Sequence, residues 1–157
     1  ETADSNTMLR FRQRFSRNME IKTNPELTPL KKPEDWTRIT FRPDLEKFGM
    51  TNLDRDAIAL MQKRVYDISG CNPSLKVFLN GGRIPIKSFK QYVALYLNEG
   101  SLESSLIHDA SQQRWEVVVM PSAGQFSNVS FVNSIWTMKG GTHVNQVSDS
   151  IVSKISE

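Results

Sequence analysis

Hydrophobic and polar residues alternate in the first part of the chain, as they do in β-strands. Within residues 8–16 three arginines at positions 10, 12 and 14 point to one side, and Phe11, Gln13 and Phe15 point to the other. Residues 36–43 alternate in the same way. If these two strands pair, their sheet has a core face of Phe and Ile side chains and an arginine-rich outer face. The proline-bearing stretch between them, residues 24–34, is expected to be an irregular loop.

Helical spacing begins near Thr51. Apolar residues then recur every three or four positions: Leu53, Ala57, Leu60, Met61, Val65 and Ile68. A Thr-x-x-Asp sequence, Thr51 to Asp54, is expected to cap the start of this helix, and Gly70 is expected to follow its last turn. A second helix is expected over residues 88–97. Asn80-Gly81-Gly82 between two apolar runs predicts a β-hairpin, because a primed turn needs positive φ.

The second half of the chain has strand-like runs at residues 106–109, 114–120 and 128–136, followed by a helical stripe. Gly140 and Gly141 precede that stripe and allow backbone angles closed to other residues. Thr142 is expected to cap the helix. The small, polar residues 100–105 are the predicted boundary between two partial α+β units, residues 1–99 and 100–157, each with helices on one side of a mostly antiparallel sheet.

Composition limits the class of protein. The chain has 157 residues, 38% hydrophobic and 24% charged, which excludes a disordered chain or a disulfide scaffold. Its single cysteine, Cys71, fits a reducing, intracellular compartment, and no apolar run is long enough to cross a bilayer. The net charge of +3 leaves two interpretations of the outer arginines. They form either a solvated surface or a basic DNA-binding module built from Arg10, Arg12, Arg14, Arg38 and Arg42.

Residue types that carry chemistry are sparse. His108 and His143 lie far apart, and with one cysteine they give no zinc spacing, so no metal site is predicted. The run from Gly140 to His143 could hold an anion at a helix start, but it lacks the lysine of a P-loop, and ordinary capping is the preferred interpretation. The residues alone therefore predict no catalytic site.

Three segments carry a family resemblance. Residues 36–48 resemble the strand that ends the ATPase domain of type II DNA topoisomerases, and residues 53–70 resemble the helix that follows it. Residues 129–135, with Gly140-Gly141-Thr142-His143-Val144 after them, resemble the opening of that family's transducer domain. The segments occur in family order, and their details are similar to the eukaryotic enzymes. The chain departs from the family at Ser127 and Asn128, where glutamines are common, and at Trp136, where a small residue is common.

The resemblance implies a fold, an activity and partners. Residues 1–99 would form the C-terminal part of a GHKL (Bergerat) ATPase sandwich, and residues 100–157 the first part of a ribosomal-S5-domain-2-like transducer. The parent protein would be a nuclear, homodimeric, ATP-hydrolysing DNA topoisomerase, an isomerase that passes one DNA duplex through a transient double-strand break. Its cofactors would be ATP and Mg²⁺, and its partners would be double-stranded DNA and a second identical subunit, with no membrane.

The resemblance also implies what this piece lacks. The family's glycine-rich ATP loop is expected before Glu1 and its transducer lysine after Glu157, so the piece is expected to be inactive alone, with no catalytic residue and no bound cofactor. One site residue is implied, since a family threonine that helps hold the adenine stands at the position of Thr37. The alternatives are a threonine bonded to neighbouring backbone and, for the whole chain, a noncatalytic interaction module derived from the GHKL fold or a mismatch-repair relative.

Overall fold

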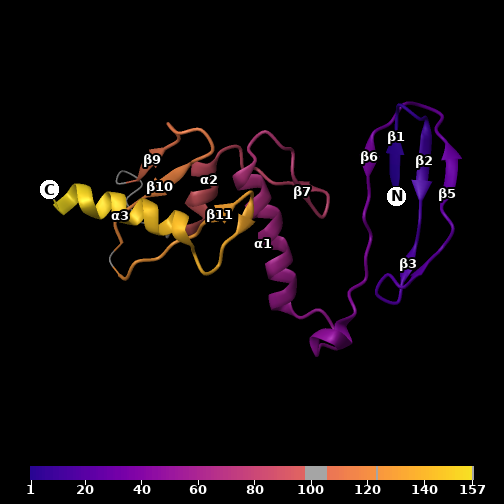
Figure 1. Cartoon of the computed structure of the whole chain (residues 1–157), viewed down its shortest axis with the longest axis horizontal. Coiled ribbons are helices and arrows are strands. Elements are labelled where there is room, and N and C mark those ends of the chain that lie inside the picture. The colour runs from indigo at the N-terminus through magenta and orange to yellow at the C-terminus, as the bar shows by residue number, and fades with distance from the viewer. Residues whose placement is uncertain (98–105, 123, 157) are drawn as a thin grey trace. The chain divides into compact units, whose positions relative to one another are not determined.

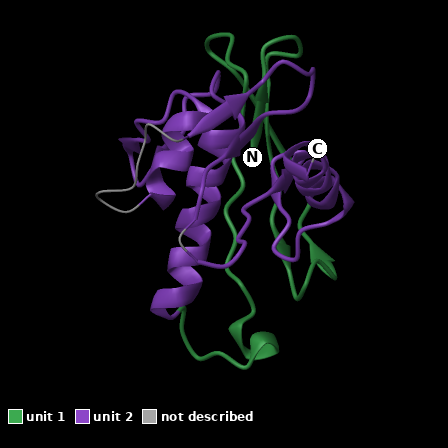
Figure 2. Ribbon diagram, turned by 90° about the vertical axis from the view of Figure 1, so that its left-hand side faces the viewer, with its two compact units in different colours: residues 1–53 green, residues 54–157 purple. Residues whose placement is uncertain are grey.

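The computed structural model describes residues 1–97, 106–122 and 124–156. It divides into two compact units, Glu1–Leu53 and Asp54–Glu157, which Figure 2 shows in green and purple. All strand pairings within the described residues are antiparallel, and none of the sheets there joins the part before residue 98 to the part after residue 105. The expected mixture of helices and antiparallel strands is therefore confirmed.

Unit 1, residues 1–53, is built on a four-stranded sheet of order β5-β2-β1-β6. Its strands are β1 (Thr2–Asp4), β2 (Leu9–Arg12), β5 (Glu26–Pro29) and β6 (Trp36–Thr37) (Figure 1). A small hairpin joins β3 (Phe15–Ser16) to β4 (Ile21–Lys22), and a 3₁₀ turn, η1, spans Leu45–Phe48. The two predicted strands thus share one sheet, but they do not pair, because β1 lies between them.

Three sequence expectations for unit 1 are wrong. The predicted loop contains β5, which is an edge strand, and an edge strand tolerates Pro29 although this residue has no N–H. The predicted strand 8–16 is interrupted after Arg12 and resumes as β3. The predicted strand 36–43 ends at Thr37, beyond which Ile39 and Phe41 are 83% and 73% exposed.

Unit 2, residues 54–157, begins with helix α1 (Arg55–Cys71). The cap is Asp54, whose carboxylate accepts a 2.8 Å hydrogen bond from the Ala57 N–H, whereas the Thr51 hydroxyl donates to Asn52. The helix therefore starts later than expected. Gly70 lies inside α1 instead of ending it. A Cβ at Gly70 would lie 2.4 Å from Cγ of Tyr92, so the glycine makes room for an aromatic ring.

The second expected helix is present as α2 (Phe89–Val93) followed by a 3₁₀ turn, η2 (Ala94–Tyr96). The expected hairpin is confirmed as β7 (Phe78–Leu79) and β8 (Gly82–Arg83), since Asn80 and Gly81 between them have φ of 50° and 83°. The hairpin and α2 supply the buried core of unit 2. That core consists of Ile84, Ile86 and Tyr92.

The second half of unit 2 contains β9 (Ile107–Asp109) paired with β10 (Val117–Val119), and helix α3 (Thr142–Ser156). The single strand predicted over residues 128–136 is instead a hairpin of β11 (Phe131–Val132) and β12 (Ile135–Trp136). Asn133 and Ser134, with φ of 50° and 63°, form its turn. Two consecutive left-handed residues reverse the chain with the twist that paired strands require.

The β11–β12 hairpin packs on α1 and α2, as Figure 1 shows. The guanidinium of Arg64 and the amide of Asn72 both donate hydrogen bonds to Ser134, the first to its carbonyl and the second to its hydroxyl. The ring of Phe131 meets Tyr92 edge to face, 5.8 Å between centroids. Residues on both sides of the predicted boundary thus share one core. The boundary itself, residues 100–105, lies outside the described residues and stays a prediction.

Candidate functional site

Thr37, the candidate adenine contact, lies in unit 1 on the edge strand β6, opposite Thr2 of β1. Its hydroxyl is 3.1 Å from the Thr2 hydroxyl, and Thr2 also donates to the Trp36 carbonyl at 3.0 Å. The side chain of Thr37 is exposed. Its hydroxyl has the Thr2 hydroxyl as hydrogen-bond partner. Because a hydroxyl has one donor and two acceptor sites, Thr37 keeps hydrogen-bonding capacity for a ligand.

The outer face of the same sheet carries Arg10 and Arg12 of β2 together with Arg38, which directly follows β6, whereas the other two predicted arginines, Arg14 and Arg42, lie outside its strands. The Glu1 carboxylate lies 3.0 Å from the Arg10 guanidinium, 3.2 Å from Arg12 and 3.7 Å from Arg38. A hydrogen bond from Arg10, together with the charges of Arg10 and Arg12, lowers the pKa of Glu1. Arg10 and Arg38 also stack on the Trp36 ring, 5.7 and 5.2 Å from its centroid. These arginines are therefore engaged with neighbours inside unit 1.

Gly140, Gly141 and Thr142 lie at the start of α3 in unit 2. Gly140 has φ of 69°, a conformation that favours glycine. The Gly141 carbonyl accepts hydrogen bonds from the Val144 and Asn145 N–H groups, so Gly141 holds the cap position and Thr142 is the first helical residue. The expectation that Thr142 caps the helix is wrong, because its hydroxyl makes no hydrogen bond within the described residues. Thr37 belongs to unit 1, whereas Gly140, Gly141 and Thr142 belong to unit 2.

A hydroxyl chain that the sequence did not reveal holds the loop before α3. The Thr137 hydroxyl lies 2.6 Å from the Ser130 hydroxyl and 3.2 Å from Nε2 of His143. It also donates to the Ser130 carbonyl at 2.9 Å. His143 therefore ties the first turn of α3 to the β11–β12 hairpin, a structural use of this residue.

A carboxylate, that of Asp67, is buried in unit 2 and is 2% exposed. Lys63 binds both its oxygens at 2.9 and 2.8 Å, and the Tyr92 hydroxyl donates to it at 2.6 Å. Burial raises the pKa of Tyr92, and the hydrogen bond to Asp67 raises it further. The Lys63 ammonium also lies 4.2 Å from the centroid of Trp136, the residue that departs from the family pattern. The Lys63–Asp67 pair could have been predicted from the sequence, because the two residues are four positions apart on one helix. The contact of Tyr92 with Asp67 could not, because these residues are 25 positions apart.

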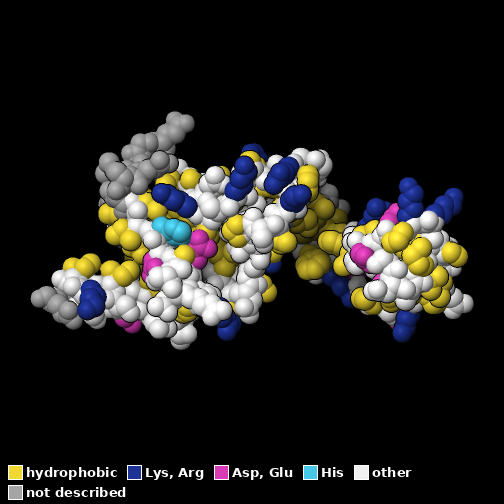
Figure 3. Space-filling model, turned by 90° about the horizontal axis from the view of Figure 1, so that it is seen from above, with side chains coloured by type: hydrophobic (Ala, Val, Ile, Leu, Met, Phe, Trp, Pro, Cys, Tyr) yellow, Lys and Arg dark blue, Asp and Glu magenta, His cyan; other side chains and the backbone are white. Residues whose placement is uncertain are grey.

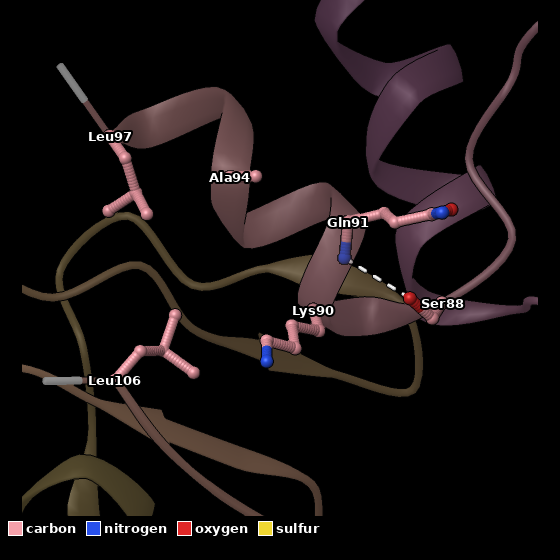
Figure 4. Close-up of a pocket in the computed structure, with 6 residues that line it drawn as sticks. All are labelled: Ser88, Lys90, Gln91, Ala94, Leu97 and Leu106. Atoms are coloured by element: carbon pink, nitrogen blue, oxygen red, sulfur yellow. Dashed lines mark hydrogen bonds between the residues drawn. The ribbon is translucent and has the colours of Figure 1, made fainter. Parts of the chain in front are cut away.

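Two concavities lie in unit 2. One, of about 350 Å³, is lined by Ser88, Lys90, Gln91, Ala94, Leu97 and Leu106. Figure 4 shows Ser88 at the start of this helical segment, accepting a hydrogen bond from the Gln91 N–H, and Leu97 at its end. The other, of about 570 Å³, lies between the β9–β10 pair and α3 and is mostly apolar. Neither lining contains a paired acid and base or a nucleophile with a base beside it.

Within residues 1–97, 106–122 and 124–156, no group of three or more His, Cys, Asp or Glu side chains could hold a metal ion. None of the described helices is long and apolar enough to cross a membrane. Cys71 is half-buried and free of a disulfide, and burial raises the pKa of its thiol.

Comparison with known proteins identifies relatives of the whole chain. A family model described as DNA gyrase B matches residues 88–157. DNA topoisomerase 2 of Arabidopsis thaliana is 50% identical over 161 residues, which cover 99% of this chain and 11% of the relative. The chain thus spans about a tenth of the length of the curated relatives that it matches.

Solved structures match it equally well. The ATPase region of Saccharomyces cerevisiae topoisomerase II superposes with a TM-score of 0.92 at 46% identity, covering 99% of this chain and 41% of that one. The ATPase and transducer domains of Balamuthia mandrillaris DNA topoisomerase II give a TM-score of 0.88 at 41% identity, covering 99% and 39%. These matches show that the chain belongs to the eukaryotic-type DNA topoisomerase II family, in which it corresponds to a segment of the ATPase and transducer region.

Proposed function

We propose that this chain is a segment of an ATP-dependent type II DNA topoisomerase, an enzyme that passes one DNA duplex through a transient break in another. The segment would join the nucleotide-binding domain to the transducer domain. Residues 1–99 would end the GHKL ATPase domain, and residues 100–157 would begin the transducer. The observation that carries the proposal is the match of 99% of the chain to the yeast ATPase region at 46% identity.

Nucleotide contact is proposed for Thr37. Its hydroxyl is exposed and already lies in a hydroxyl pair with Thr2 on a sheet face shared with Phe11 and Leu27, so a polar group and an apolar surface stand side by side. Such a surface suits the edge and face of an adenine ring. Within the proposal this chain contacts the adenine base through Thr37.

The direct test is a chimera in which residues 1–157 replace the matching segment of yeast topoisomerase II. We expect the purified chimera to hydrolyse ATP and to unlink interlocked DNA circles only when ATP is present. A chimera that folds and dimerises but neither hydrolyses ATP nor unlinks circles would reject the proposal. It would favour the alternative, a noncatalytic module that shares the GHKL fold.

Thr37→Val in that chimera tests the assigned contact. The variant keeps the β-branch and removes the hydroxyl, so ATP affinity should fall about two- to tenfold, the equivalent of one hydrogen bond. Thermal stability should hardly change, because Thr37 is exposed and Thr2 keeps its bond to the Trp36 carbonyl. Thr40→Val is the matched control, since Thr40 is exposed too and makes no hydrogen bond within the described residues. Equal ATP affinity in the two variants would reject the contact.

Partners and location follow from the same proposal. A protein of this activity acts on double-stranded DNA as a pair of identical subunits, and in a eukaryotic cell it works in the nucleus. Analytical ultracentrifugation of the chimera with and without a non-hydrolysable ATP analogue tests the pairing, which should strengthen when nucleotide is bound.

A further inference from the structure

One stretch of unit 2 carries positive charge without any negative charge. Residues 68–98 contain no Asp or Glu, yet they include Lys76, Arg83, Lys87 and Lys90. All four side chains are exposed. None of the four forms an ion pair with the part of the chain that the structure describes. Three of them, Lys76, Arg83 and Lys87, lie in the β7–β8 hairpin or in the few residues on either side of it.

Strand geometry places these three cations on one face. Phe78 pairs with Arg83, and the Ile84 N–H donates to the Val77 carbonyl at 2.9 Å, so the pairing continues beyond the two short strands. Because side chains alternate along a strand, Ile84 and Ile86 point into the core, where they are 6% and 7% exposed. The alternate positions form the opposite, exposed face. Its three cations, Lys76, Arg83 and Lys87, are named the basic hairpin face, and the exposed side chains of Phe78 and Pro85 lie beside them.

The surface view agrees with this pattern. Figure 3 shows dark-blue Lys and Arg side chains gathered on the side of unit 2 that faces the viewer. In unit 1 the comparable arginines share the carboxylate of Glu1, which offsets part of their charge. Among the residues that the structure describes, no carboxylate pairs with a cation of the basic hairpin face, so this charge is available to a partner.

We propose that the basic hairpin face binds the phosphate backbone of duplex DNA. Neighbouring side chains on one face of a hairpin stand about 5–7 Å apart, and a duplex presents one phosphate charge per about 1.7 Å of axis, so each of the three cations can reach its own phosphate. The choice of duplex DNA as the polyanion rests on the proposed function. The contact is to the backbone, and it is independent of base sequence.

The test measures binding of the 157-residue chain to a fluorescent duplex of mixed sequence by anisotropy, over a series of salt concentrations. Three phosphate contacts predict that the association constant falls about 40-fold between about 50 and 200 mM salt. The triple variant Lys76→Gln, Arg83→Gln, Lys87→Gln should bind more weakly at low salt. Its slope of log affinity against log salt should be smaller by about 2.7, which is roughly 0.9 for each lost contact.

A matched control removes the same charge elsewhere. Lys31→Gln, Lys32→Gln, Lys47→Gln also changes the net charge by three, and these lysines are exposed in unit 1 without ion pairs among the described residues. The control should keep the original affinity and slope. Equal losses in the two triple variants would overturn the proposal, because binding would then follow net charge. Absence of duplex binding by the unmodified chain at low salt would also overturn it.

Substitution of Phe78 tests whether the chain binds duplex or single-stranded DNA. Its side chain is 55% exposed among the cations, and a base could stack on it only if the strand were unpaired. Phe78→Ala should leave duplex affinity unchanged. A marked loss, or tighter binding of single strands than of duplex by the unmodified chain, would overturn the duplex assignment. The assay contains no nucleotide, so its failure is distinguishable from failure of the chimera to hydrolyse ATP.

Discussion

The two units are stabilised by different interactions. In unit 1 the core residue among the described hydrophobics is Ala3, 4% exposed, and the sheet's outer face is covered by ion pairs of Glu1 with three arginines. In unit 2 two isoleucines and Tyr92 are buried around the charged network of Asp67 and Lys63. Exposed ion pairs contribute little to stability, whereas a buried, hydrogen-bonded charge is strongly destabilising if its partner is lost. Single substitutions should therefore act much more strongly in unit 2.

The largest effect is expected from Asp67→Ala. It removes the acceptor of two Lys63 bonds and of the Tyr92 hydroxyl, so the partly buried Lys63 ammonium loses its carboxylate while the Tyr92 hydroxyl keeps only the Tyr96 hydroxyl. We expect the free energy of unfolding to fall by about 3 kcal/mol in urea denaturation. Asp149→Ala on the exposed surface of α3 is the control and should stay within about 0.5 kcal/mol. Similar effects of the two variants would break the contrast between core and surface.

Gly70→Ala should have the next largest effect. The added methyl would lie 2.4 Å from Tyr92 Cγ, so either α2 moves or the ring leaves its place. Overpacking of this kind costs about 1–3 kcal/mol, partly offset by about 1 kcal/mol of helix propensity gained over glycine. Gly124→Ala, which meets no atom within 4 Å, is the control. A neutral Gly70→Ala would show that the contact between α1 and α2 is loose.

The starts of α1 and α3 should respond differently to loss of a polar side chain. Asp54→Ala removes a real cap bond to Ala57 and should lower stability by about 1 kcal/mol. Thr142→Ala removes no hydrogen bond seen in the described residues and replaces threonine by a better helix former, so its effect should stay within about 0.5 kcal/mol. Chemical denaturation of both variants measures the difference. A loss of about 1 kcal/mol from Thr142→Ala would restore its assignment as a cap.

The smallest effect is expected on the stability of unit 1 when the pH is lowered. Hydrogen bonds and charges lower the pKa of three carboxyls in unit 1, namely Glu1 through Arg10, Asp4 through Thr7 and Asp35 through Ser5. A carboxyl whose pKa is lower when folded stabilises the fold above its unfolded pKa, near 4, and this contribution is lost as pH falls through the folded pKa. Amide exchange followed from pH 7 to pH 3 should therefore show unit 1 loosening before unit 2. Glu1→Gln should reduce that pH dependence, and simultaneous loosening of the units would contradict it.

Local signals in the sequence predicted much of the fold. The apolar stripes of α1 and α3 and the Asn80-Gly81 turn are encoded within a few residues of each other. The Asn133-Ser134 turn was missed because its flanks read as one apolar run, and β5 was missed because its prolines are tolerated only at a sheet edge. At the candidate site, Thr37 could be selected by resemblance. Its partner Thr2 could not, since it lies 35 positions away.

The fixation of the β11–β12 hairpin on α1 has a mechanical consequence. Lys63, Arg64 and Asn72 contact the hairpin from positions spread over about 13 Å of helix axis, at 1.5 Å per residue. The bonds from Arg64 and Asn72 hold the hairpin at Ser134 in its turn, and the Lys63 ammonium over the Trp136 ring holds it at β12. Contacts at these two places prevent the hairpin from pivoting about either one. The hairpin must therefore move with α1 as one rigid body. When the helix tilts, the loop that leads from the hairpin into α3 is displaced in proportion to its distance from the tilt axis.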